Sequence, residues 1–198
     1  MIVGSRERSS ASPRPAGMEG FVALHARAKA GMLSPAEREE HRFLRGAFLA
    51  AITDLQNAGL ARGQIRRATV RIRRAMQVDL SGPGFTARTA TLDVGLGGFC
   101  ALLSEPPCPG DLLRARLRLS GSRSLDAVVT AVSARRRQRA AHVSFAFRER
   151  TGDWTPFEDL VVDHLLTDLG SGGRAGLTEA ISEWLVDAGR ADLLGSTG

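Results

Sequence analysis

Several residue types are scarce in this chain, and each scarcity excludes something. The 198 residues include no tyrosine, one lysine (Lys29) and two cysteines, Cys100 and Cys108. Two cysteines are too few for a disulfide framework, and no apolar run approaches the roughly 18 residues that a membrane-spanning helix needs. The first 17 residues are polar and contain no apolar signal-peptide core. We therefore expect a cytoplasmic protein that does not insert into a membrane.

Patterns that carry catalysis are also missing. No spacing of histidine and cysteine matches a metal site, and there is no phosphate-binding loop with a lysine and no Ser/His/Asp ordering. Cys100 lies in an apolar stretch and is predicted to be a core thiol. Cys108 lies in a proline-rich loop without a basic neighbour to activate it. The histidines fall in different predicted elements: His25, His41, His142 and His164. We predict neither an enzyme nor a metal or cofactor site.

Positive charge is abundant and localised. The net charge is +6, from 27 basic and 21 acidic residues. Residues 59–90 hold seven arginines and one acidic residue, Asp79, which leaves 20 basic and 20 acidic residues elsewhere. The whole excess therefore lies in about thirty residues and indicates an anionic partner there. A general arginine bias of the genome is the competing explanation for the arginine count.

Helices are predicted on both sides of a central region. Ser34-Pro35-Ala36-Glu37 is a capping box with proline at the first helical position, and an apolar stripe follows as far as Leu55, which predicts a helix over 35–58. A shorter helix is predicted over 20–30, and another from Thr155 to about 167. The stripe of helix 35–58 packs either on its own domain or on a second copy or partner.

Between these helices the apolar period changes from about 3.6 to 2. Alternating stretches at 75–80, 85–92, 112–119, 125–134 and 141–147, with an apolar stretch at 99–103, predict six short strands in a small barrel or sandwich. The chain thus divides into a disordered tail (1–17), a helical region (18–61), a barrel followed by a helix (62–167), and a Gly/Ser linker with a final helix (168–198). The fold class is α+β.

Two short patterns stand out within the central region. Arg66-Arg67-Ala68-Thr69-Val70-Arg71 places arginines four residues apart just before the first strand, and guanidinium groups suit guanine edges and phosphates. Asp93-Val94-Gly95-Leu96-Gly97-Gly98 forms a glycine-rich connection between strands. Taken singly, the first pattern proves little, because a solvated basic loop explains it and Arg62 and Arg66 repeat its spacing. The second pattern, taken singly, is better explained by an ordinary glycine turn.

In this order and spacing, the two patterns resemble a PilZ domain, the bacterial receptor for cyclic di-GMP. That family has Arg-x-x-x-Arg followed by Asp/Asn-x-Ser-x-x-Gly, and here Asp93 follows Arg71 by 22 residues. The strand that begins at Gly98, the Pro109-Gly110-Asp111 turn and the strand around 143–147 continue the resemblance. It covers roughly residues 62–167.

The resemblance implies a six-stranded antiparallel PilZ-type barrel with cyclic di-GMP, as a monomer or intercalated dimer, on its outer wall. It implies that Arg67 and Arg71 grip guanine edges and phosphates, with Arg66 adding a contact. Asp93 would accept from a guanine N–H edge. Gly95 and Gly98 would let the ligand approach the backbone.

One departure from the family pattern is Gly95, which stands where the family usually has serine. Loss of a hydroxyl contact costs about 0.5–1.5 kcal/mol, so we expect weaker binding and not abolished binding.

Two other functions stay open. One is a degenerate PilZ-like module that no longer binds nucleotide and acts through its helices on a protein partner or on a second copy. The other is a nucleic-acid binder, which the near-absence of stacking aromatics in the basic region disfavours. Because helix 35–58 leads directly into the arginine loop, ligand that orders the loop is expected to reorient that helix.

Overall fold

The computed structural model describes residues 17–62, 66–119, 121–137 and 139–170. The predicted tail, apart from its last residue, and the predicted final helix lie outside these residues. None of the helices in the described ranges is long and apolar enough to span a bilayer.

The three described helices are α1 (Met18–Lys29), α2 (Pro35–Ala58) and α3 (Thr155–Gly170). The predicted bounds of α2 are confirmed, and so is its capping box. The Glu37 N–H donates to the Ser34 hydroxyl at 3.3 Å, and the Ser34 N–H donates to the Glu37 carboxylate at 2.9 Å. These two bonds satisfy backbone donors that the first helical turn leaves without partners.

Seven antiparallel strands form one sheet, in which β4 pairs with both β7 and β3. Strands β2 to β7 thereby close into a six-stranded barrel, and β1 adds to the outside of β3. This arrangement confirms the predicted α+β fold with a closed antiparallel barrel. The strands are β1 (Arg71–Ile72), β2 (Gln77–Gly82), β3 (Phe85–Gly95), β4 (Gly98–Leu103), β5 (Leu112–Arg118), β6 (Ser124–Arg137) and β7 (Ala140–Thr151).

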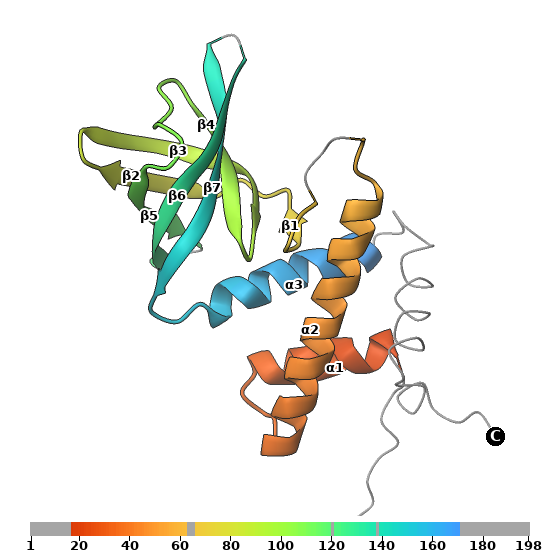
Figure 1. Cartoon of the computed structure of the whole chain (residues 1–198). Coiled ribbons are helices and arrows are strands. Elements are labelled where there is room, and N and C mark those ends of the chain that lie inside the picture. The colour runs from red at the N-terminus through yellow and green to blue at the C-terminus, as the bar shows by residue number, and fades with distance from the viewer. Residues whose placement is uncertain (1–16, 63–65, 120, 138, 171–198) are drawn as a thin grey trace, which may run out of the picture.

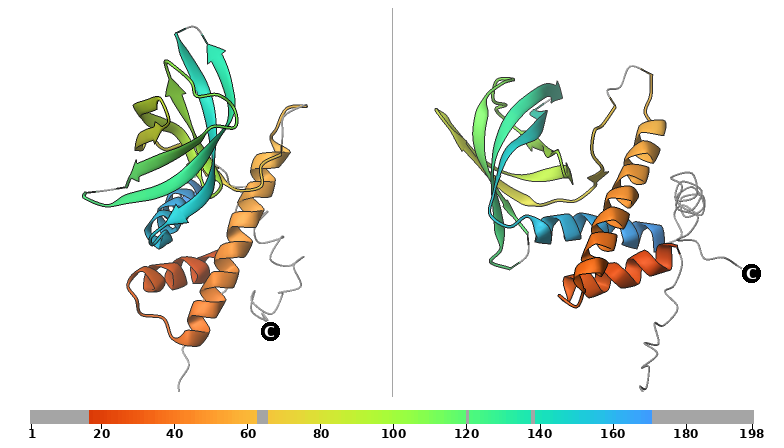
Figure 2. Two further views of the ribbon diagram at one scale, coloured as in Figure 1. Left: turned by 60° about the vertical axis from the view of Figure 1, so that its left-hand side comes forward. Right: turned by 60° about the horizontal axis from the view of Figure 1, so that its bottom comes forward.

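One hydrophobic core joins the barrel to the helices. Phe99 and Phe145 fill the barrel interior, and Phe157 of α3 is fully buried in the same cluster. Phe48 and Ile52 of α2 belong to it as well. Each such side chain contributes roughly 1.5–3 kcal/mol on burial. Helix α3 runs from the barrel toward α1 and α2, and β1 lies between the barrel and α2 (Figures 1 and 2).

Four segments differ from the sequence prediction. Residues 71–72, expected to precede the first strand, form β1, because they pair with Gly95 and Val94 of β3. Residues 168–170, predicted as the start of a linker, are the last residues of α3.

Residues 135–137, predicted as part of a basic turn, continue β6, because each pairs with a residue of β7 and so extends the ladder. Asp93 and Gly95, predicted as part of a connection, belong to β3, because that strand pairs with β4 on one side and β1 on the other. The turn itself is reduced to Leu96 and Gly97.

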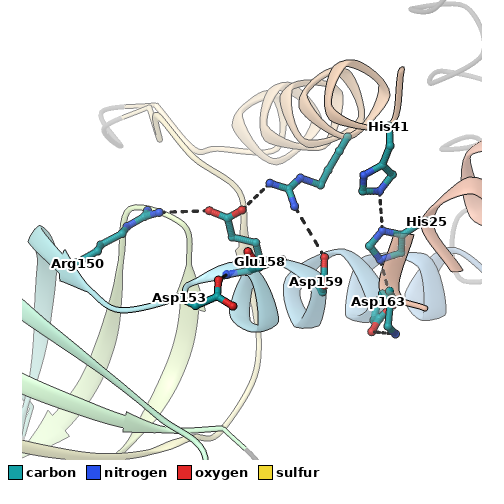
Figure 3. Close-up of polar contacts among 10 residues, drawn as sticks. His25, His41, Arg150, Asp153, Glu158, Asp159 and Asp163 are labelled. Carbon is teal, nitrogen blue, oxygen red and sulfur yellow. Dashed lines mark hydrogen bonds and ion pairs between the residues drawn. The ribbon is translucent and has the colours of Figure 1, made fainter. Parts of the chain in front are cut away.

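A polar network ties the barrel to the helical region (Figure 3). Arg150 of β7 lies 3.5 Å from the Glu158 carboxylate of α3, and Glu158 accepts from Arg45 of α2 at 2.5 Å. The second Arg45 nitrogen lies 3.8 Å from Asp159. Burial raises the pKa of Asp159, although the nearby His25 and Arg45 oppose that shift.

Candidate functional site

The two sequence patterns meet at one pair of side chains. Arg71 donates from Nη1 to Oδ1 of Asp93 at 2.5 Å, although 22 residues separate them in the chain. Arg71 belongs to β1 and Asp93 to β3, so the strand pairing itself brings the arginine to the carboxylate. The result is one positive and one negative group side by side on the outer wall of the barrel.

Gly95 makes this meeting possible because it has no side chain. It is the strand partner of Arg71, and a Cβ at this position would lie 2.0 Å from the Val70 carbonyl oxygen. A serine here would therefore collide with the backbone that leads into β1. Glycine in place of serine at residue 95 therefore has two consequences in this fold. It removes a hydroxyl, and it leaves the space that the Val70 carbonyl oxygen occupies.

Gly98 has a comparable role on the next strand. A Cβ there would lie 1.9 Å from the Phe145 carbonyl oxygen of β7, and its φ of +155° is a conformation that favours glycine. In this structure, the space beside Gly95 and Gly98 is taken by the backbone of the chain itself. The expected approach of a ligand to these two glycines is therefore not available in this conformation.

The other two candidate arginines lie on the loop before β1. Arg66 and Arg67 are exposed and line a groove of about 490 Å³ between this loop and α2. Arg66 lies 3.9 Å from Asp54 of α2, with both side chains exposed. Among the described residues, the Arg67 guanidinium has no ion-pair partner. The structure brings Arg71, Asp93, Gly95 and Gly98 together and leaves Arg66 and Arg67 beside α2.

Two amide side chains at the end of α2 hold the arginine segment, and sequence reasoning missed both. Gln56 donates to the Arg71 carbonyl at 2.6 Å and accepts from the Arg71 N–H at 3.0 Å. Asn57 likewise donates to the Arg67 carbonyl at 2.9 Å and accepts from the Arg67 N–H at 2.8 Å. No sequence signal marks this role, since Asn57 near Gly59 is equally typical of a helix end.

Cys100 is buried on β4, next to the Arg71–Asp93 pair. Its strand partners are Asp93 and Ser144, and it alternates with the inward-facing Phe99 and Ala101. The prediction of a buried thiol is confirmed, although Cys100 lies on the face of β4 opposite to Phe99 and Ala101. Burial raises the pKa of the thiol, and the charge of Asp93 raises it further. Both effects keep the sulfur protonated and unreactive.

The turn of the second pattern is also anchored to the rest of the barrel. Arg150 donates a hydrogen bond to the Leu96 carbonyl oxygen, and its guanidinium stacks 4.9 Å from the centre of the Trp154 ring. The same arginine contacts Glu158 of α3, as described above. The turn between Gly95 and Gly98 is thus fixed from the side of α3.

A larger groove lies on another part of the barrel wall and fits a ligand less well. Its volume is about 950 Å³, and it extends over β2, β3, β5, β6 and β7. Two of its three arginines are already neutralised, since Arg88 pairs with Asp79 at 2.6 Å and Arg116 with Asp126 at 2.7 Å. In the described part of the chain, no cluster of His, Cys, Asp or Glu is arranged to hold a metal ion.

Comparisons with known proteins give structural similarity only. No family model matches the chain, and no curated protein matches it. One similar solved structure is the inhibitor of motility MotI/DgrA of Bacillus subtilis, with 16% identity, a TM-score of 0.43, and coverage of 54% of this chain and 53% of that chain.

YcgR of Escherichia coli in complex with c-di-GMP is similar at 20% identity and a TM-score of 0.40, over 55% of this chain and 48% of that chain. The PilZ domain of YcgR with c-di-GMP matches at 18% identity and a TM-score of 0.40, over 56% of this chain and 95% of the domain. The matched region spans about half the length of the first two proteins. Similarity at this level assigns no function, which has to be argued from the site residues.

Proposed function

We propose that this protein is a non-catalytic receptor that binds cyclic di-GMP at the Arg71–Asp93 pair, with Arg67 and Arg66 on the loop beside it. The observation that carries the proposal is the contact of 2.5 Å between Arg71 and Asp93, which joins the two separate motifs into one site. No further cofactor is required, and the proposed place of action is the cytoplasm.

The chemistry of the pair complements guanine. Guanine presents two acceptors, O6 and N7, on one edge and N–H donors on another. A guanidinium donates two parallel hydrogen bonds to the acceptor edge, and a carboxylate accepts from the donor edge. Arg71 and Asp93 supply one group of each kind at adjacent positions.

The loop arginines complement the rest of such a ligand. Cyclic di-GMP carries two phosphates, and Arg66 and Arg67 lie exposed on the segment that carries the whole net charge of the chain. Because the Arg67 side chain has no ion-pair partner among the described residues, no ion pair with one of them has to break before it reaches a phosphate.

Rearranging the Arg71–Asp93 pair costs little. The side chains are 26% and 32% exposed, so solvent screens their attraction. A pair of this kind contributes about 0.2–1 kcal/mol, whereas a hydrogen bond to a charged group in a complex contributes about 1.5–3 kcal/mol. Exchanging the partner of Arg71 for a guanine edge is therefore favourable.

Calorimetric titration with three ligands tests the proposal. We expect saturable binding of cyclic di-GMP and at least about tenfold weaker binding of cyclic di-AMP, because adenine places an amino donor where guanine has O6. A single-stranded oligonucleotide serves as the third ligand, at low and at physiological salt.

Each result leads to a different conclusion. Strong, salt-dependent binding of the oligonucleotide alone would favour the nucleic-acid alternative. Absence of binding to all three ligands at tens of micromolar would favour the interaction module that acts through its helices.

A further inference from the structure

The end of α2 holds the backbones of both motif arginines. The side-chain amides of Gln56 and Asn57 each form two hydrogen bonds, one donated and one accepted, with a single residue of the arginine segment. Each amide therefore satisfies both backbone groups of its residue, as a neighbouring strand would. The four bond lengths lie between 2.6 and 3.0 Å.

We infer that Gln56 and Asn57 are positioning residues of the ligand site, an inference that rests on the proposed function. Gln56 fixes the backbone of Arg71, whose guanidinium meets Asp93. Asn57 fixes the backbone of Arg67, whose guanidinium has no ion-pair partner among the described residues. Neither amide needs to touch the ligand, because each sets the point from which an arginine side chain reaches it.

The neighbouring contacts explain why this support is needed. Strand β1 has only two residues, Arg71 and Ile72, and a strand of that length has little stability of its own. Its one barrel neighbour is β3. On the side toward α2, Gln56 supplies the hydrogen bonds that a further strand would otherwise supply.

The same contacts connect the ligand site to α2. A movement of α2 relative to the barrel must either carry Arg67 and Arg71 with it or break the four hydrogen bonds. Binding that holds the arginines in one place therefore also holds the last turn of α2. By linkage, a partner that displaces α2 lowers the affinity for the ligand by the same factor by which the ligand lowers the affinity for that partner.

The variants Gln56→Met and Asn57→Leu test the inference, because they roughly preserve side-chain size and remove the hydrogen-bonding groups. Methionine has nearly the helix propensity of glutamine, and leucine has a higher propensity than asparagine, so neither change weakens α2 through propensity. Gln77→Met on β2 is the matched control, since it makes the same chemical change outside α2 and the arginine segment. We expect each of the first two variants to bind cyclic di-GMP about three- to tenfold more weakly than the control variant.

A local measurement separates positioning from general destabilisation. In hydrogen-exchange experiments without ligand, the amides of Arg67 and Arg71 should exchange faster in the α2 variants, while those of the barrel strands β5 and β6 should not change. With ligand present, exchange in the last turn of wild-type α2 should slow.

The outcomes are distinguishable. Unchanged affinity and unchanged exchange at Arg67 and Arg71 would overturn the inference while leaving the proposed function intact. If wild-type protein binds no cyclic di-GMP, the proposed function fails. In that case faster exchange in the variants would still support the role of the two amides in holding the loop, and unchanged exchange would overturn it.

Discussion

The two motif arginines are held alike at the backbone and differently at the side chain. Arg71 lies on a strand, and its guanidinium is fixed on the carboxylate of Asp93. Arg67 lies on a loop, and its guanidinium projects beside α2 without an ion-pair partner among the described residues. The comparison teaches that one arginine is preorganised against the barrel wall, whereas the other is available for recruitment by an anion. Although the Arg71 guanidinium exchanges its partner on binding, it is already held at the barrel wall. It should therefore lose less entropy than the Arg67 guanidinium and contribute more to affinity.

The largest effect is expected from Arg71→Ala. Loss of a charged hydrogen-bonding group should cost about 1.5–3 kcal/mol, which corresponds to roughly 10- to 150-fold weaker binding of cyclic di-GMP. Calorimetry measures this directly. Arg88→Ala is the control, because it removes the same charge from the same basic segment and also breaks an ion pair with a carboxylate, Asp79. Equal losses in both variants would show that only overall charge matters.

Gly95→Ser should displace β1, because Gly95 is the strand partner of Arg71. The variant thereby tests whether Arg71 depends on being held against the barrel. Although serine is the usual family residue, its Cβ would lie 2.0 Å from the Val70 carbonyl oxygen. We expect about 1–3 kcal/mol lower unfolding free energy, measured in urea, and weaker binding of cyclic di-GMP. Tighter binding with unchanged stability would show that the missing hydroxyl, and not the packing of β1, is the important consequence of Gly95.

Acid should destabilise α2, the helix whose side chains bind the backbones of both arginines. His41 of α2 contacts His25 of α1 at 3.0 Å, and burial, followed by the charges of His25 and Arg45, lowers the pKa of His41 to about 4. Its unfolded pKa is about 6.5, so unfolding takes up a proton between these values. The stabilisation is complete above pH 6.5 and declines as the pH falls toward 4.

The protonation of His41 should therefore lower the unfolding free energy by about 2 kcal/mol between pH 7 and pH 5, and the raised pKa of Asp159 acts in the opposite direction. Urea titrations of wild type and His41→Gln measure the difference, and the variant should lose most of it. The Glu37 carboxylate, whose pKa is lowered to about 2 chiefly by its hydrogen bond with Arg27, acts only at lower pH. An unchanged pH dependence in His41→Gln would assign the effect to other groups.

The smallest effect is expected from Arg67→Ala. Binding should weaken by about three- to tenfold, less than for Arg71→Ala, because the free side chain has to be ordered on binding. The unfolding free energy should stay within about 0.5 kcal/mol of wild type. Arg71→Ala should lower it by about 0.2–1 kcal/mol through the lost ion pair. If the two variants ranked in the opposite order for affinity, the comparison between the two arginines would be wrong.

Local patterns in the sequence predicted much of the fold. The capping box and apolar stripe located helix 35–58, and the alternation of Leu113, Ala115 and Leu117 with arginines located β5. Signals of this kind lie within one element and depend on its own period. Closure of the barrel came from the family resemblance, since strand alternation alone was equally compatible with a sandwich.

The parts that could not be predicted all depend on distant segments meeting. Strand β1 has two residues, too few to show any period. The sequence shows that residue 95 has no side chain, but it does not show that the Val70 carbonyl occupies the space. In the sequence, Gln56 and Asn57 resemble an ordinary helix end. Their role depends on the later segment with Arg67 and Arg71, which passes next to them in the folded chain. The proximity of Arg71 and Asp93 followed from the family resemblance and not from spacing alone.

The most direct measurement follows the arginine side chains during binding. In a ¹⁵N–¹H spectrum of the full chain, the side-chain Nε–H signals of Arg67, Arg71 and Arg88 can be assigned with single Arg→Lys variants. On titration with cyclic di-GMP, we predict saturable shifts for Arg67 and Arg71 and none for Arg88. Binding without a shift at Arg71, or no binding at all, would contradict the assignment of the Arg71–Asp93 pair as the nucleotide site.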